Sequence, residues 1–287
     1  MIYLVLSVLC SSLIFVIFKF FDVYKIQTLY AIVTNYIVAS LSGLFFYKEK
    51  VVVAEVYHSS WFWGTLALGG LFITVFNLMA KTSQKIGVSV ASVATKMSFI
   101  IPVIIGVLLY QEALSFLKII GIIIALIAVY FASVKETSIA ISKNKLLLPV
   151  LVFLGSGIID ASLNYFRETK LATTEFPLFS STVFAAAATI GILFILINSF
   201  KKPFKINLRN IAGGIILGVP NYFSIFFLLK ALQNDALNSA SIFTINNVAI
   251  VMFSTILGIV LFKEKLSVKN WSGIALAIFS ILLVALF

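Results

Sequence analysis

The chain has 287 residues, of which 62% are hydrophobic and 11% are charged, and its formal net charge is +11. A soluble domain carries roughly 25% charged residues, so this composition excludes a water-soluble globular protein and predicts an all-α integral membrane protein. The Lys and Arg residues are scattered over short polar segments, which argues against nucleic acid as a partner and favours the lipid bilayer.

A helix that spans a membrane needs about 20 apolar residues, and ten stretches of the chain meet this requirement. In chain order they are 2–18, 28–47, 62–80, 88–110, 115–133, 146–165, 176–198, 211–232, 239–262 and 268–287. The first is predicted to be a membrane helix and not a signal peptide, because the residues after it, FKFFDVYK, offer no cleavage site.

Two prolines lie inside predicted helices, Pro102 within 88–110 and Pro220 within 211–232. A proline has no N–H for the helix ladder, so each is predicted to kink its helix. Two interpretations stay open for these kinks: one serves helix packing alone, and the other shapes a cavity between helices.

The two halves of the chain resemble each other. The segments 88–133 and 237–285 each contain a long apolar stretch, a short polar corner with one Glu, and a second long apolar stretch. At one fixed offset, six residues of the first half match six of the second. In order, Gly69, Lys81, Gln84, Ala91, Ser92 and Thr95 match Gly218, Lys230, Gln233, Ala240, Ser241 and Thr244. After a shift of three residues, those that match Gly258, Glu264, Leu266, Ser267, Gly273 and Ala277 are Gly106, Glu112, Leu114, Ser115, Gly121 and Ala125. These matches predict an internal repeat with halves 1–138 and 139–287.

Five helices per half is an odd number, so the second half must enter the membrane from the opposite side. Such inverted repeats are typical of secondary transporters, whose substrate site lies near the midplane where the repeats meet. The shift of three residues has two explanations. The helix 239–262 is either longer than its counterpart or locally unwound at Asn246 and Asn247.

The two corners read LLYQEALSFLKIIGIIIALIAVYF and VLFKEKLSVKNWSGIALAIFSILLVAL, and the first is preceded by LMAKTSQKIGVSVASVATK. These phrases resemble the end of each half of the EamA family, which belongs to the drug/metabolite transporter superfamily. Family members often have a glycine before the corner Glu, where this chain has YQE and FKE. The resemblance covers the whole chain, and it implies two five-helix halves and a transport function without naming a substrate.

Two charged residues fall well inside predicted helices, Lys96 and Asp160. A charge at the centre of a membrane helix costs roughly 2.5–3.5 kcal/mol, so each is expected to face the bundle interior or water. Lys96 is expected to point into the central cavity and meet an anionic group of the substrate; the alternatives are snorkelling to the interface or an ion pair with Asp160. Asp160 is a candidate for substrate binding, and if transport is coupled to protons it is also the candidate for proton coupling.

Uncharged polar side chains in the same helices can hydrogen-bond a polar solute, and they equally serve to hold helices together. The candidates for substrate binding are Asn77, Ser92, Thr95, Asn164, Asn221, Tyr222, Asn246 and Asn247. The corner residues Glu112 and Glu264 are predicted to be structural, as acceptors of hydrogen bonds from free helix N-termini.

We therefore expect a secondary transporter that exports a small organic solute, such as an amino acid, a metabolite or a drug-like compound, by alternating access. It is expected in the cell (inner or plasma) membrane, as a monomer or homodimer. No set of catalytic or metal-binding residues is visible, since His58 is the only histidine and Cys10 the only cysteine, so neither enzyme activity nor a cofactor is predicted. The alternative is a non-transporting multi-pass protein, such as an assembly partner or a lipid-modifying enzyme.

The basic residues also predict an orientation. Fourteen Lys and Arg residues lie on the side of the membrane that holds the loops after predicted helices one, three, five, seven and nine. Six lie on the opposite side. Because basic loops stay in the cytoplasm, this count predicts both termini outside it. The family resemblance implies cytoplasmic termini instead.

Overall fold

The computed structural model describes residues 2–47, 51–110, 115–133, 143–171, 175–200, 207–232 and 239–286, and all regular structure within them is helical. The helices are α1 (Ile2–Val23), α2 (Thr28–Phe46), α3 (Val53–His58), α4 (Phe62–Lys85), α5 (Val88–Met97), α6 (Ile100–Tyr110), α7 (Phe116–Ser133), α8 (Lys143–Thr169), α9 (Phe176–Ser199), α10 (Leu208–Leu232), α11 (Ser239–Phe262) and α12 (Val268–Leu286). Within the described ranges, eight helical stretches are long and apolar enough to cross a membrane, and two shorter apolar ones are Ile119–Ala132 and Val268–Leu283. The protein is therefore a multi-pass helical membrane protein.

The stretch 88–110 is interrupted in its middle. α5 ends at Met97 and α6 begins at Ile100, with a turn at Ser98 and Phe99 between them. The cause is Pro102, which has no N–H to donate to the carbonyl of Ser98 four residues earlier. That carbonyl instead accepts a 2.9 Å hydrogen bond from the N–H of Ile101, which tightens the chain into a turn of the 3₁₀ type. The predicted kink is thus a complete break between two helices.

The corresponding helix of the second half is continuous. α11 runs through Asn246 and Asn247 without interruption, so the predicted alternative of local unwinding there is wrong. α11 is only one residue longer than the span from the start of α5 to the end of α6, so a longer helix as the reason for the three-residue shift stays a prediction. α10 likewise continues through Pro220. The short helix α3 was not among the predicted elements.

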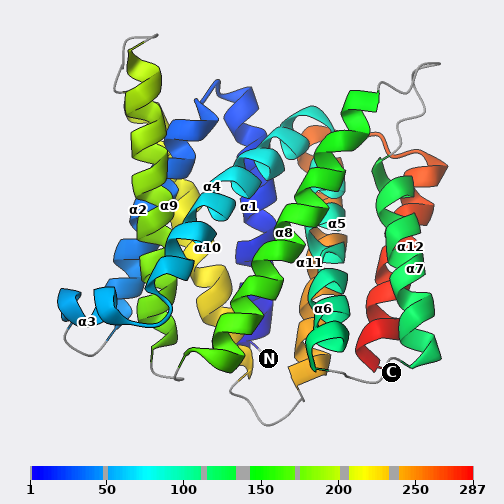
Figure 1. Cartoon of the computed structure of the whole chain (residues 1–287). Coiled ribbons are helices and arrows are strands. Elements are labelled where there is room, and N and C mark those ends of the chain that lie inside the picture. The colour runs from blue at the N-terminus through cyan, green and yellow to red at the C-terminus, as the bar shows by residue number, and fades with distance from the viewer. Residues whose placement is uncertain are drawn as a thin grey trace.

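The helices form one bundle in which partners are far apart in the sequence (Figure 1). α7 packs along α12, α5 against α11, and α2 against both α9 and α10. α1 lies among α4, α10 and α11. Both chain ends lie at the lower end of the bundle in Figure 1. An even number of membrane crossings is consistent with this arrangement.

Buried apolar side chains form two large clusters on either side of α5. One contains Phe18, Tyr36 and Phe76 of α1, α2 and α4, and the other contains Met97 and Val251 of α5 and α11. Because α5 contributes side chains to both clusters, it is a central helix of the bundle. The break after Met97 therefore lies in the interior of the protein.

Two neighbouring glycines of α4 provide a test of helix packing. A Cβ atom at Gly69 would lie 2.7 Å from the amide nitrogen of Ala187 in α9, whereas one at Gly70 would meet nothing nearer than Cδ1 of Ile190 at 3.9 Å. We expect Gly69→Ala to destabilise the protein by about 1–3 kcal/mol, because overpacking forces α4 and α9 apart. Gly70→Ala, with the same gain in helix propensity, should leave the protein as stable or slightly more so. Thermal unfolding of the two variants in detergent compares them, and equal melting temperatures would contradict the packing argument.

Candidate functional site

The break between α5 and α6 brings a serine next to the carboxylate of α8. Ser98 Oγ lies 3.3 Å from Oδ2 of Asp160 and 2.6 Å from the carbonyl oxygen of Thr95. Both neighbours are acceptors, so one hydroxyl proton serves the two. The carboxylate is therefore held at the point where the backbone of the α5–α6 segment leaves its helical path.

Lys96 lies within electrostatic range of this carboxylate. Its side chain is half-buried, and its charge interacts with that of Asp160. A cation and an anion thus lie near the same helix break. We call Lys96, Ser98 and Asp160 the inner polar cluster.

Asp160 is exposed although it lies on the inward face of α8. The outer face of this helix carries the exposed side chains of Leu147, Leu154 and Ile158. A helix turns by about 100° per residue, so Asp160 lies roughly 200° around the axis from Ile158. Asn164, one turn further along, is also exposed on the inward side. Inward exposure of two polar side chains indicates space beside them that packed side chains do not fill.

Ser156 lies one turn before Asp160 on the same inward side of α8. It is buried, and its hydroxyl has no hydrogen-bond partner. Buried hydroxyls normally find a partner, so a free one beside the inner polar cluster is available to a bound solute or a water molecule.

A second amide faces inward from α11. Asn247 is half-exposed, while the exposed side chains of Ile245, Met252 and Ile256 mark the opposite, outer face of the helix. Asn247 therefore shares the interior with the inner polar cluster, without a direct contact to it among the described residues.

Other predicted site residues already have hydrogen-bond partners within the protein, either in their own helix or in a neighbouring one. The hydroxyls of Ser92 and Thr95 donate to carbonyls of their own helix, at 2.9 and 2.8 Å. Asn246 accepts a 3.1 Å bond from Ser7 of α1. Asn221 donates a 3.1 Å bond to the side-chain oxygen of Asn35 in α2, and the amide nitrogen of Asn35 has no partner.

Two further candidates lie away from the inner polar cluster. Asn77 donates to the carbonyl of Ile73, on the side of α4 that carries the exposed Trp63. The ring of Tyr222 stacks on Phe46 of α2, with centroids 5.7 Å apart and an angle of 10° between the rings. The structure therefore places these two residues at the outside of the bundle.

Two contributors were missed from the sequence. Ser98 was not among the predicted site residues, although its position four residues before Pro102 marks the carbonyl that the proline leaves free. Ser156 carries no such signal, because its role depends on which face of α8 turns inward.

The predicted structural role of Glu264 agrees with the geometry at the start of α5. Its Oε1 accepts a 2.7 Å hydrogen bond from the N–H of Val88. Its Oε2 accepts from the hydroxyl of Ser89 at 3.0 Å and lies 3.4 Å from the N–H of the same residue. A carboxylate at a helix N-terminus satisfies free N–H groups and meets the positive end of the helix dipole. The corresponding Glu112 lies outside the described residues.

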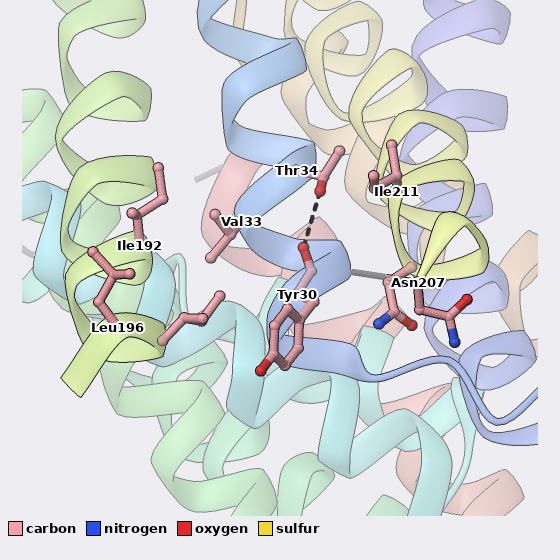
Figure 2. A pocket seen from close by; sticks show the side chains of 9 residues that line it. Tyr30, Val33, Thr34, Ile192, Leu196, Asn207 and Ile211 are labelled. Carbon is pink, nitrogen blue, oxygen red and sulfur yellow. Dashed lines mark hydrogen bonds between the residues drawn. The ribbon is translucent and has the colours of Figure 1, made fainter. Parts of the chain in front are cut away.

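Figure 2 shows a pocket of about 240 Å³ between α2, α9 and α10. Its lining residues are Tyr30, Val33, Thr34, Ile192, Ile195, Leu196, Asn207, Asn210 and Ile211. The hydroxyl of Thr34 is turned back to the carbonyl of Tyr30, 3.1 Å away. The wall is almost entirely apolar and shares no residue with the inner polar cluster. We therefore assign this pocket no part in binding a polar solute.

Among the residues that the structure describes, no group of three or more His, Cys, Asp or Glu side chains lies together. The polar groups near the helix break can bind a solute by charge and hydrogen bonding.

Three comparisons with known proteins bear on this site. The model of the EamA-like transporter family matches residues 1–134. An uncharacterized protein of Haemophilus influenzae is 31% identical over 287 residues, which cover 97% of this chain and 95% of the relative. A crystal structure with 13% sequence identity superposes with a TM-score of 0.62 over 99% of this chain and 96% of that one, and thus shares its fold.

Proposed function

Because the chain belongs to the EamA-like transporter family, we propose that it is a secondary transporter that exports a small organic solute across the cell membrane. The observation that carries this proposal is the inner polar cluster. Lys96 and Asp160 place opposite charges near a break in a central helix, beside the free hydroxyl of Ser156. Charged groups at this depth are costly, and they are typical of substrate and proton pathways.

The packing supports two inverted five-helix repeats over 1–138 and 139–287, although the boundary between them lies outside the described residues. In this scheme the helices of the first repeat correspond in chain order to those of the second: α1 to α8, α2 to α9, α4 to α10, α5–α6 to α11 and α7 to α12. The pairs α2–α9, α5–α11 and α7–α12 each join a helix to its counterpart, as expected around a two-fold axis in the membrane plane. Movement of one repeat against the other provides alternating access to a site between them.

A departure from this symmetry supports an opening at one end. α1 packs against α4 and α5, whereas its counterpart α8 makes at most marginal contact with α10 and α11 among the described residues. The exposed Asp160 and Asn164 lie in the half of α8 that is nearer the lower end in Figure 1. We propose that a water-filled cavity reaches the inner polar cluster from this end, where both chain termini lie.

Flux measurements on purified protein in liposomes test the proposal. A panel of amino acids, organic acids and drug-like amines should include a solute that exchanges across the membrane, with faster accumulation in a proton gradient. The same solute should raise the melting temperature, because a ligand that binds only the folded state stabilises it. Absence of flux and of stabilisation across the panel, with folded protein, would overturn the transport function.

A further inference from the structure

We propose that the Glu264 carboxylate is a releasable clasp, which holds the end of the bundle opposite the termini closed and must open in each transport cycle. The clasp joins the corner between α11 and α12 to the N-terminus of α5. These two elements belong to different repeats, so the bond spans the interface that alternating access requires to move. The inference rests on the proposed transport function and adds a named gate to it.

The contacts of Glu264 are strong enough to hold two segments together and remain reversible. The carboxylate accepts bonds of 2.7 and 3.0 Å from Val88 and Ser89. Hydrogen bonds to an ionised group are stronger than neutral ones, and the positive end of the α5 dipole adds to them. All the bonds converge on a single side chain, so a small movement of the corner breaks them together. Water can then hydrate both the carboxylate and the free N–H groups.

Two glycines shape the space for the carboxylate. A Cβ at Gly258 would lie 2.6 Å from Oε2 of Glu264, and one at Gly87 would lie 3.0 Å from Oε1. Gly87 also has φ of 152°, a conformation that side chains with a Cβ rarely adopt. On the other side, Lys263 has φ of 52°, which ends α11 and turns the chain so that Glu264 points back toward Gly258. The backbone conformation of both segments thus leaves room for the Glu264 carboxylate and directs it toward the start of α5.

The sequence repeat contains a related carboxylate, which lies outside the described residues. Glu112 matches Glu264, and the residues that match Val88 and Ser89 are Leu237 and Asn238. Gly87 is matched by Ala236, so the sequence around the clasp is not repeated in full. Because the Glu264 contacts hold the upper end closed, removal of this carboxylate should favour the state that is open at that end.

Cysteine accessibility measures the clasp without reference to transport. Cys10, the only natural cysteine, is replaced by serine, and single reporters are introduced as Ser92→Cys and Asn164→Cys. Ser92 is buried one turn inward of the clasp, and Asn164 is exposed toward the other end. In nanodiscs, where both ends are accessible, a water-soluble maleimide should label Asn164→Cys rapidly and Ser92→Cys slowly.

Glu264→Ala should raise the labelling rate of Ser92→Cys by about tenfold or more and lower that of Asn164→Cys, as expected for loss of hydrogen bonds to a charged group. Glu55→Ala, which removes an exposed carboxylate of α3, is the matched control and should change neither rate. If Glu264→Ala does not fold, Gly258→Ala tests the same contact, because its Cβ displaces the carboxylate. Unchanged rates in folded protein overturn the clasp, even if flux is normal. Shifted rates support it, even if no solute is transported.

Discussion

Substitution of Asp160 by asparagine is expected to abolish accumulation driven by a proton gradient, while exchange of solute between the two sides continues. The asparagine keeps the size of the side chain and can still accept a hydrogen bond from Ser98, but it cannot bind and release a proton. Accumulation should fall by at least about tenfold, which corresponds to ~1.4 kcal/mol of lost coupling. The measurement is uptake into liposomes with and without a pH difference, together with exchange at equal pH.

Asp22→Asn is the matched control, because Asp22 is an exposed carboxylate in the last turn of α1. It should leave both accumulation and exchange unchanged. Gradient-driven accumulation that survives Asp160→Asn would show that the proton is carried elsewhere or that another ion drives transport.

Substitution of Lys96 by alanine is expected to remove exchange as well as accumulation. The ammonium is proposed to bind an anionic group of the solute, and its loss also leaves Asp160 without the opposite charge nearby. The loss of exchange in this variant measures how much the ammonium contributes to binding the solute. Lys96→Arg retains the charge and should keep part of the exchange activity, with altered solute preference because the guanidinium is larger and planar.

Lys81→Ala is the control for Lys96, since Lys81 is an exposed basic residue near the end of α4. A variant that combines Lys96→Ala with Asp160→Asn should be less impaired than the sum of the single variants, because the two charges interact. Normal flux in Lys96→Ala would refute a substrate contact and leave a snorkelling lysine as the explanation.

The fold was largely predictable because the constraint behind it is simple. A backbone that crosses lipid must satisfy its own hydrogen bonds, so long apolar stretches become helices. Eight helical stretches of the described residues are long and apolar enough to cross a membrane, so the count of ten stays a prediction. The position of the break near Pro102 also follows from the chemistry of proline. Its completeness, with α5 and α6 as separate helices, depends on packing around Ser98 and Phe99 that the sequence does not specify.

The site was predictable only in part. Lys96 and Asp160 are recognisable because charge inside an apolar stretch is rare. Asn77 and Tyr222 were selected by residue type, yet both lie outside the inner polar cluster. In a soluble protein the polar face of a helix reveals its outside, but lipid and bundle interior are both apolar, so this contrast is weak in a membrane helix. Which face turns inward is set by neighbours such as Gly157, whose Cβ would meet Ile101 of α6.

The break between α5 and α6 gives the middle of the protein a field that needs no ionisable side chain. The carbonyl end of α5 carries partial negative charge close to Lys96, and the amide end of α6 carries partial positive charge close to Asp160. Each peptide dipole belongs to the backbone, so substitution of Lys96 or Asp160 does not remove it. A variant that lacks both ionisable groups therefore still presents a partial negative charge and a partial positive charge, at the two helix ends, to a dipolar solute. The solute selectivity that this variant retains measures how much of solute recognition comes from the backbone dipoles.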